Sequence, residues 1–211
     1  MRWDLCVITD RRVAGGLSHA ELAKRALAGG ARMIQLRDKE ASMRALLPEA
    51  LQVAERCRSS GATFIVNDRL DLALAVGADG VHLGQEDLPA KETRRLLGEG
   101  KLLGISTHSL EQALKAQEEG ADYIGVGPIF RTGTKEMGYE PIGPPLIREV
   151  RRKVTIPILA IGGITLENVS EVIAAGADGA AVISAIAGAP DITAAVKKFL
   201  KVIRQVKEAF S

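Results

Sequence analysis

Three basic side chains that lie far apart in the sequence each follow a short apolar run. Arg37 and Lys39 come after MIQL (33–36), and Lys135 lies beyond YIGVG (123–127) in the stretch RTGTK. If these runs are parallel strands, their carboxyl ends share one edge and the cations converge there. Converging cations are typical of a site for a polyanion, most simply phosphate or diphosphate. The alternative for each residue alone is a charge that faces solvent.

Two acids follow other apolar runs and would lie beside these cations. Asp68 comes shortly after FIV, and Asp87 closes the loop after GVHL. Carboxylates next to a diphosphate are typical ligands of Mg²⁺, which binds through one or two carboxylates plus phosphate oxygens. The spacing equally allows a salt bridge, for instance from Asp68 to Arg69, or a helix cap by either acid.

Glycines and a hydroxyl near the end of the chain form a third group of candidates. Gly162 and Gly163 end one apolar run, and Ser184 ends the next. Backbone amides beside glycines, with a nearby hydroxyl, commonly bind phosphate in barrels of alternating strands and helices. A tight turn that needs glycine is a compatible interpretation. The remaining polar candidates at strand ends are Gln35, Asn67, Ser106, His108, Thr132 and Thr134.

The elements that would position these residues are short apolar runs that recur along the whole chain. They do not alternate polar with apolar residues, which is typical of strands covered on both faces in parallel sheets. The predicted strands are residues 5–9, 33–36, 64–66, 80–83, 102–106, 123–127, 158–162 and 179–184.

Helical patterns lie between these runs. Ser18 and Glu21 form a capping box ahead of one helix, and Ser109 and Thr165 open two others. Pro48 predicts a break or a fresh helix start within residues 41–61. Strands that each precede a helix predict an α/β protein, a (β/α)8 TIM barrel formed by residues 1–211 as a single domain. A doubly wound open sheet is the alternative, but the Gly-rich dinucleotide turn after its first strand is missing.

The composition narrows the class of protein. A formal net charge of +2 over 211 residues argues against a general nucleic-acid binder. The chain has no run of 18 apolar residues, so no membrane span is predicted. The first residues lack the apolar core of a signal peptide. Cys6 and Cys57 have no ligand-like spacing, which favours buried free thiols over a disulfide. We therefore expect a cytoplasmic protein.

The histidines offer little on their own. His19 is expected on an exposed first helical turn, and His82 is expected to be a hydrogen-bonded interior residue. No HExxH, paired-cysteine or Ser-His-Asp pattern is present, so the sequence predicts neither a zinc site nor an acyl-transfer site.

Taken together, the motifs resemble the thiamine-phosphate synthase family, also called thiamine-phosphate pyrophosphorylase. They cover nearly the full chain in the family's order and are specific as a set: VITDR, QLRDK, VNDR, GVHLGQEDLP, GISTHS, ADYIGVGPIF, TGTK, AIGGIT and AVISAI. The resemblance implies a transferase that joins 4-amino-2-methyl-5-hydroxymethylpyrimidine diphosphate to thiazole phosphate and releases pyrophosphate. Mg²⁺ is the implied cofactor, and the two substrates are the implied partners.

The resemblance also implies a role for each candidate residue. The implied contacts are the pyrimidine for Gln35; the diphosphate for Arg37, Lys39, Asn67 and Lys135; Mg²⁺ for Asp68 and Asp87; the reacting centre and the bound phosphates for Ser106, Thr132 and Thr134; and the thiazole phosphate for Gly163, Ile183 and Ser184. Lys135, Ser106 and Arg37 are the three expected to act on the reaction itself. Arg131 stands where the family usually has proline. This departure leaves two alternatives for the loop at 131–135: a looser loop or an added phosphate contact.

The implied mechanism is dissociative. The diphosphate leaves first, the electron-rich aminopyrimidine carries the resulting cation, and the thiazole nitrogen attacks it. One alternative is a related barrel family that rearranges the thiazole phosphate tautomer with a histidine at the place of His108. Another is a non-catalytic regulatory relative, in which the site residues would be eroded. The presence of Asp68 and Asp87 favours the synthase, and the sequence leaves a homo-oligomer open.

Overall fold

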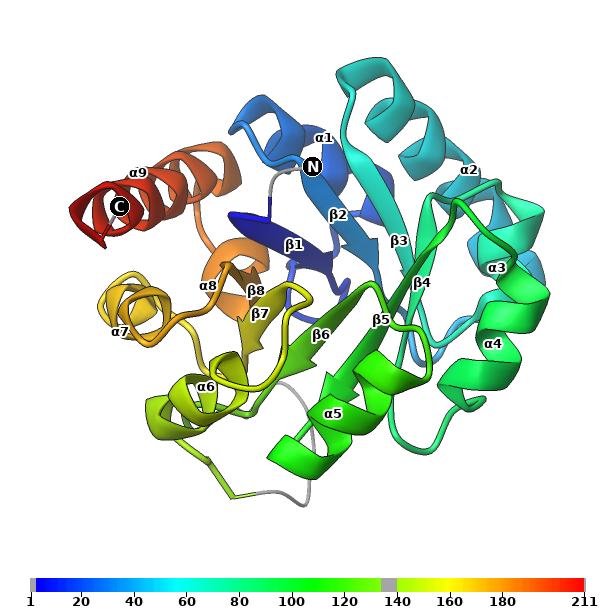
Figure 1. The fold of residues 1–211 in the computed structure, drawn as a ribbon. Coiled ribbons are helices and arrows are strands. Elements are labelled where there is room, and N and C mark those ends of the chain that lie inside the picture. Colours follow the sequence, from blue (N-terminus) through cyan, green and yellow to red (C-terminus); the bar gives the residue numbers. More distant parts are fainter. Residues whose placement is uncertain (1–2, 134–139, 211) are drawn as a thin grey trace.

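Parallel strands pair in sequence order and close into a barrel at the centre of the molecule (Figure 1). The computed structural model describes residues 3–133 and 140–210, and this part of the chain contains eight strands. Closure comes from pairing of the first strand with both the second and the eighth. The strands are β1 (Leu5–Thr9), β2 (Met33–Leu36), β3 (Thr63–Asn67), β4 (Gly80–Leu83), β5 (Leu102–Thr107), β6 (Tyr123–Val126), β7 (Ile158–Ile161) and β8 (Gly179–Val182). The predicted (β/α)8 TIM barrel is confirmed.

Helices alternate with the strands and surround the barrel (Figure 1). They are α1 (His19–Ala28), α2 (Met43–Ser60), α3 (Leu70–Ala75), α4 (Ala90–Leu97), α5 (Leu110–Glu118), α6 (Pro144–Arg151), α7 (Val169–Ala174), α8 (Ser184–Ala187) and α9 (Ile192–Phe210).

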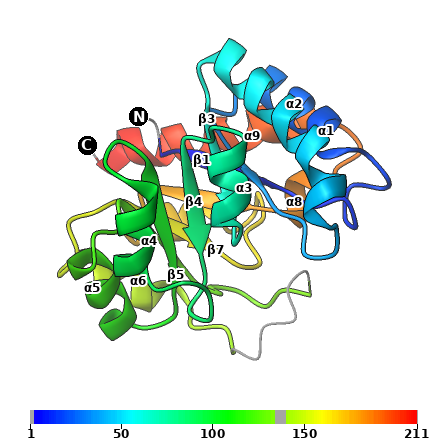
Figure 2. The ribbon, with the colours of Figure 1, turned by 90° about the vertical axis from the view of Figure 1, so that its right-hand side faces the viewer.

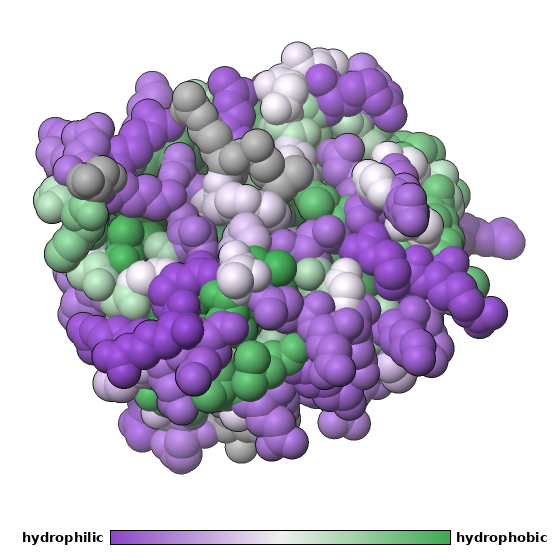
Figure 3. All heavy atoms as spheres, viewed as in Figure 1, coloured by the Kyte–Doolittle hydropathy of each residue, from purple (hydrophilic) through white to green (hydrophobic). Residues whose placement is uncertain are grey.

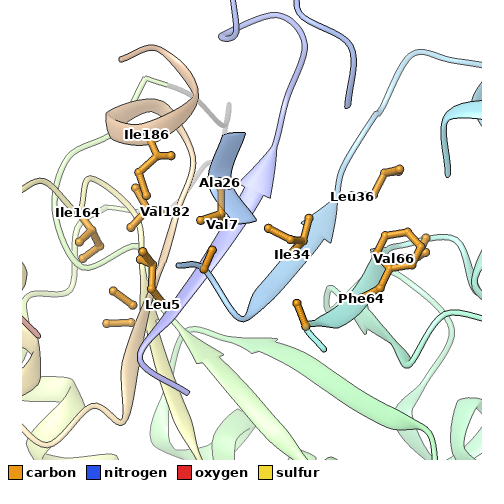
Figure 4. Close-up of a cluster of buried hydrophobic side chains, with 14 of the residues drawn as sticks. Leu5, Val7, Ala26, Ile34, Leu36, Phe64, Val66, Ile164, Val182 and Ile186 are labelled. Atoms are coloured by element: carbon orange, nitrogen blue, oxygen red, sulfur yellow. The ribbon is translucent and has the colours of Figure 1, made fainter. Parts of the chain in front are cut away.

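Each strand contributes to two separate apolar layers, because successive side chains of a strand point to opposite faces. Val7, Ile34 and Val66 pack outward into the layer between strands and helices (Figure 4). Cys6 and Met33 belong to a smaller cluster inside the barrel. Burial on both faces explains why the strands read as continuous apolar runs, and full burial of one such aliphatic side chain contributes about 1.5–3 kcal/mol.

The predicted helix starts are correct in two of three places. The Ser18 hydroxyl accepts a hydrogen bond from the Glu21 amide at 3.1 Å, and Ser109 caps α5 in the same way. Thr165 was predicted to open a helix, but α7 begins at Val169. The Asn168 side chain instead accepts a hydrogen bond from the Thr165 amide at 2.8 Å, which makes residues 165–168 a turn.

The predicted break at Pro48 is wrong, because α2 continues through this residue. Pro48 lies in the second turn, so its missing N–H affects only the carbonyl of Arg44. Ser42 caps the helix through the Ala45 amide at 3.3 Å. An apolar face that includes the buried Leu46 packs on the core, and this packing holds the helix together across the proline.

Both cysteines are buried free thiols, as predicted. Burial raises the pKa of Cys6 and of Cys57 to about 12. Within residues 3–133 and 140–210, no helix is both long enough and apolar enough to span a membrane. The face seen in Figure 1 is covered mostly by hydrophilic residues, with smaller hydrophobic groups between them (Figure 3).

Candidate active site

The predicted site residues gather at the mouth of the barrel, meaning the carboxyl ends of the strands and the loops that follow them. Figure 2 shows the barrel from the side, with the arrow of β4 pointing toward the mouth. The strand register places Asn67 beside His82, and Ser106 beside Gly125. Asn67 and His82 are therefore neighbours in the register, and Ser106 lies two residues beyond Gly104, the β5 partner of His82.

Gln35 lies two residues after Met33 on β2, so its side chain also points into the barrel. It is only 3% exposed, and no hydrogen bond joins its side-chain amide to another described residue. A side-chain amide carries both hydrogen-bond donors and an acceptor. This amide is therefore suited to a ligand that brings both a donor and an acceptor.

Arg37 lies on the same side of the chain, just beyond β2. Its Nη1 atom is 2.5 Å from Oδ2 of Asp10, and both side chains are at most 5% exposed. Arg12 adds a second ion pair to Asp10 at 3.1 Å. Nε of Arg37 is buried with no hydrogen-bond partner among the described residues. A buried guanidinium with an unused donor is suited to a phosphate oxygen.

The sequence reasoning missed Asp10, although it directly follows β1 at the mouth. The signal was its position in VITDR, one residue beyond a strand. Its carboxylate holds the Arg37 guanidinium in place and compensates a buried charge that would otherwise be unpaired.

Lys39, Asp68 and Asp87 lie together, as the sequence predicted. Lys39 Nζ is 2.6 Å from Asp68 Oδ2, and Oδ2 of Asp87 accepts a hydrogen bond from the Gly84 amide at 2.7 Å. Burial raises the pKa of Asp87, the Gly84 amide opposes this, and the neighbouring Asp68 carboxylate raises it further. The two carboxylates are thus close enough to repel each other.

Asp68 does form a salt bridge, as the alternative interpretation allowed, but with Lys39 rather than Arg69, and the predicted helix caps are absent from α3 and α4. Arg69 pairs with Asp71 at 2.9 Å. Asp68 has a φ of 62°, and no other described residue except glycine has a positive φ. Such a conformation costs about 1–3 kcal/mol and is typical of functional sites.

Asp68 and Asp87 fit a magnesium ion whose remaining ligands come from substrate oxygens and water. No group of three or more His, Cys, Asp or Glu residues that could hold a metal is present in the described residues. Two adjacent carboxylates, Asp68 and Asp87, are enough when phosphate oxygens and water complete an octahedral shell. The mutual repulsion of the acids and the Lys39 ammonium beside them indicate a place where positive charge is favourable.

His82 joins two hydroxyls inside the barrel, so its predicted interior position is confirmed. The exposed fraction of His82 is 6%. Its Nε2 atom lies 2.9 Å from Oγ of Ser106, and its Nδ1 atom lies 3.0 Å from Oη of Tyr123. Ser106 is half-buried at the mouth, whereas Tyr123 is fully buried.

The predicted exposure of His19 is wrong, because this residue is fully buried. Its Nδ1 atom lies 2.7 Å from Oγ1 of Thr9, and its Nε2 atom lies 3.1 Å from Oδ2 of Asp38. Arg11 pairs with the same carboxylate at 3.0 Å. The loop after β2 folds over the start of α1, a long-range contact that a local helix pattern does not reveal. This network anchors the loop that carries Lys39.

His108 is held by the loop beyond β6. Its Nδ1 atom hydrogen bonds to the carbonyl oxygen of Gly127, and its backbone amide donates to Oε1 of Gln112 at 2.7 Å. These contacts match the structural role that the sequence left open for this residue.

The proposed phosphate cradle lies at the ends of β7 and β8. Gly162 and Gly163 have φ values of 95° and 64°, and a side chain at Gly163 would collide with the backbone of Phe130 and Arg131. Ser184 was predicted to end a strand, but β8 stops at Val182. It is instead the exposed first residue of α8, and the backbone turns at the buried Ile183.

The loop that follows β6 is described only in part. Thr132 is half-buried and Arg131 is exposed. Thr134 and Lys135, which the sequence assigns to the same loop, lie outside the described residues.

A (β/α)8 barrel with paired cations and acids at the carboxyl ends of its strands is typical of proteins that bind phosphorylated small molecules. A family model described as thiamine monophosphate synthase matches residues 5–186. The chain therefore belongs to the thiamine monophosphate synthase family, and the family resemblance seen in the sequence is confirmed.

Individual relatives agree with this assignment. The chain is 51% identical over 207 residues to a thiamine-phosphate synthase of Methanocella arvoryzae, with 98% of each chain covered. It is 50% identical over 206 residues to a thiamine-phosphate synthase of Moorella thermoacetica, again with 98% of each covered. Among solved structures, a thiamine phosphate pyrophosphorylase from Pyrococcus furiosus superposes with a TM-score of 0.88 at 41% identity and covers 96% of each chain.

Proposed function

We propose that this chain couples 4-amino-2-methyl-5-hydroxymethylpyrimidine diphosphate to thiazole phosphate, giving thiamine phosphate and pyrophosphate. The observation that carries the proposal is the pair Gln35 and Arg37. Both side chains are buried on one side of the β2 segment, and Nε of Arg37 lacks a hydrogen-bond partner among the described residues. An amide next to a guanidinium suits a ligand that joins a heteroaromatic ring to a diphosphate.

The pyrimidine end of this ligand would lie against Gln35. The amide can donate to one ring nitrogen and accept from the exocyclic amine, which gives both orientation and specificity. Arg37, Lys39, Asn67 and Lys135 would then surround the diphosphate. Asp10 holds the Arg37 guanidinium at 2.5 Å, so this cation is already oriented before the substrate arrives.

Asp68 and Asp87 would hold Mg²⁺ together with the diphosphate oxygens. When bound, this ion would neutralise negative charge on the leaving diphosphate. Lys39 would turn from Asp68 toward the diphosphate, because the metal would replace the ammonium as the positive partner of that carboxylate. Each charge at the mouth would then keep an opposite partner in the complex.

The proposed reaction needs side chains that position the substrates and stabilise charge, and it needs no side-chain nucleophile. The bond between the pyrimidine methylene carbon and the diphosphate oxygen breaks, and its electron pair leaves with the diphosphate. Arg37 and Lys39 stabilise that charge as it develops. The lone pair of the thiazole nitrogen then forms the new bond to the methylene carbon. Ser106, Thr132 and Thr134 would line this centre.

The thiazole phosphate would lie over the ends of β7 and β8. Gly163 lets the backbone approach a phosphate oxygen closely, and the exposed hydroxyl of Ser184 is available to the same group. Ile183 would pack against the thiazole. Buried free thiols at Cys6 and Cys57 fit a reducing cytoplasm. A homo-oligomer remains a separate hypothesis.

The test is a calorimetric titration of the pyrimidine diphosphate with Mg²⁺ into wild type and Gln35→Met. Loss of the buried amide should weaken binding about tenfold, since a hydrogen bond contributes about 0.5–1.5 kcal/mol. Gln52→Met is the matched control, because Gln52 is exposed on the outer surface of α2. Equal affinities for Gln35→Met and wild type would contradict the proposed site.

A further inference from the structure

We propose that Tyr123 and His82 are positioning residues that fix the direction of the Ser106 hydroxyl proton, so that Ser106 donates a hydrogen bond to an oxygen of the bound diphosphate. The inference rests on the proposed function for the identity of that anion. The direction of the proton itself follows from the barrel interior alone.

The three side chains form a continuous chain of hydrogen bonds across three neighbouring strands. Tyr123 on β6 contacts Nδ1 of His82 on β4 at 3.0 Å, and Nε2 of His82 contacts Oγ of Ser106 on β5 at 2.9 Å. The chain runs from a fully buried phenol to a half-buried hydroxyl at the mouth. It therefore connects the closed interior of the barrel with the place where substrate is expected.

Two glycines make room for this arrangement. A side chain at Gly104 would collide with the Tyr123 ring and with Nδ1 of His82, and one at Gly125 would approach Cε1 of His82 to 3.2 Å. Trp3 also packs against the Tyr123 ring, with the ring centroids 5.1 Å apart. The phenol and the imidazole are thus confined to one orientation each.

The direction of the hydrogen bonds follows from the surroundings of Tyr123. This side chain packs among apolar neighbours that include Ile65 and Leu159. Burial raises the pKa of Tyr123 well above its usual value, so the hydroxyl keeps its proton. In residues 3–133 and 140–210, that hydroxyl has no hydrogen-bond partner other than Nδ1 of His82. A buried O–H group needs an acceptor, so Nδ1 must accept.

The remaining bonds are then determined. An imidazole whose Nδ1 accepts carries its proton on Nε2, and this N–H donates to Oγ of Ser106. The Ser106 hydroxyl has its proton left to give, and the mouth is the direction in which a ligand can receive it. An anionic oxygen there gains a charge-assisted hydrogen bond. The opposite direction would present a lone pair of Ser106 to the diphosphate.

The first test reads the tautomer directly. The full-length chain with ¹⁵N-labelled histidine is measured by NMR near neutral pH, where protonated and unprotonated ring nitrogens resonate apart, and His82→Gln assigns the signals. The expected result is an unprotonated Nδ1 and a protonated Nε2 in His82. A proton on Nδ1 would overturn the proposal, whatever the enzyme turns out to make.

The second test asks whether Tyr123 acts through Ser106. Tyr123→Phe should lower kcat about tenfold, with little change in either KM, because its effect is on a hydrogen bond to a leaving group. In a Ser106→Ala background the same substitution should have almost no further effect. A similar tenfold loss in that background would overturn the proposal and assign Tyr123 a general structural role.

Thr193→Val is the matched control for Tyr123→Phe. It removes a part-buried hydroxyl on α9 that donates to the Arg25 carbonyl at 2.9 Å, away from the mouth. It should leave kcat within about twofold. A loss equal to that of Tyr123→Phe would mean that removal of any partly buried hydroxyl disturbs the barrel. This outcome too would contradict a specific role for the hydrogen-bond chain from Tyr123 through His82 to Ser106.

Discussion

Lys39 Nζ lies 2.6 Å from Asp68 Oδ2, so one of the proposed diphosphate ligands neutralises one of the proposed metal ligands. The 52% exposure of the Lys39 side chain leaves it free to swing, whereas the Asp68 side chain is 22% exposed and its backbone is held at a φ of 62°. A diphosphate arriving with Mg²⁺ offers an anion to the lysine and a cation to the carboxylate. The ion pair can therefore be exchanged without leaving either charge unpaired.

The acids should be needed for turnover and not for folding. Asp68→Ala and Asp87→Ala should each reduce kcat by about tenfold to a hundredfold or more, because loss of metal-site residues has effects of at least this size. EDTA should abolish activity and added Mg²⁺ should restore it. Asp71→Ala is the control, since it removes an exposed acid that pairs with Arg69. Full activity in the presence of chelator would remove the metal from the mechanism.

Gly163 should tolerate no side chain, for a reason that separates it from Gly61, a glycine with a similar φ. Gly163 and Gly61 have φ values of 64° and 61°, so alanine at either costs about 1 kcal/mol of backbone strain. Of these two glycines, Gly163 is the one whose new Cβ would meet backbone atoms, at 2.5 Å from the Arg131 carbonyl oxygen. Gly163→Ala should raise the KM for thiazole phosphate, and Gly61→Ala should not. Equal kinetics in both variants would argue against a phosphate cradle here.

Asp38 should stabilise the fold in a pH-dependent manner. Burial alone would raise its pKa, but the amides of Ala41 and Glu40, with His19 and Arg11, lower it to about 2. A carboxyl with a lowered pKa stabilises the fold fully above its ordinary value of about 3.9 and loses this contribution as the pH falls toward 2. Asp38→Asn should therefore reduce the free energy of unfolding at pH 7 by about 2 kcal/mol.

Denaturant unfolding of wild type and Asp38→Asn between pH 7 and pH 2 measures this effect. The difference between the two should shrink below about pH 4, where wild type loses the charged form. A difference that stays constant down to pH 2 would show that packing, rather than charge, is responsible.

His108 should contribute little to coupling. Its ring is bound to the Gly127 carbonyl and its amide to Gln112, which is a structural arrangement. His108→Asn should keep the coupling rate within about tenfold, short of the roughly 10²–10⁴-fold loss expected for a general acid or base. Steady-state coupling by both proteins, with a parallel assay for thiazole tautomer conversion, decides the point. A drop of a thousandfold would give His108 a chemical role.

The sequence predicted the strands well because a strand buried on both faces has apolar residues at successive positions. LCVIT, for example, is fully buried over Leu5–Thr9. The mouth was predictable because polar residues follow the strand ends in the sequence. Lys39 follows β2 and Asp68 follows the neighbouring β3, and the two side chains form an ion pair.

The errors have a common physical origin in contacts between distant segments. His19 looked like an exposed first-turn residue, yet Asp38 and Thr9 enclose it. Pro48 looked like a helix break, yet packing of the buried face of α2 outweighs one lost hydrogen bond. Asp10 was missed because its role depends on Arg37, which lies 27 residues away. A local pattern marks Asp10 as a strand-end residue, but it does not reveal which distant side chain any of these residues contacts.

The most direct test of the proposed function mixes the purified full-length chain with the pyrimidine diphosphate, thiazole phosphate and Mg²⁺. The products are then quantified by chromatography. The proposed reaction predicts thiamine phosphate and pyrophosphate in equal amounts, and neither when either substrate is omitted. Folded, metal-replete protein that forms neither product, or that only interconverts thiazole phosphate tautomers, would contradict it.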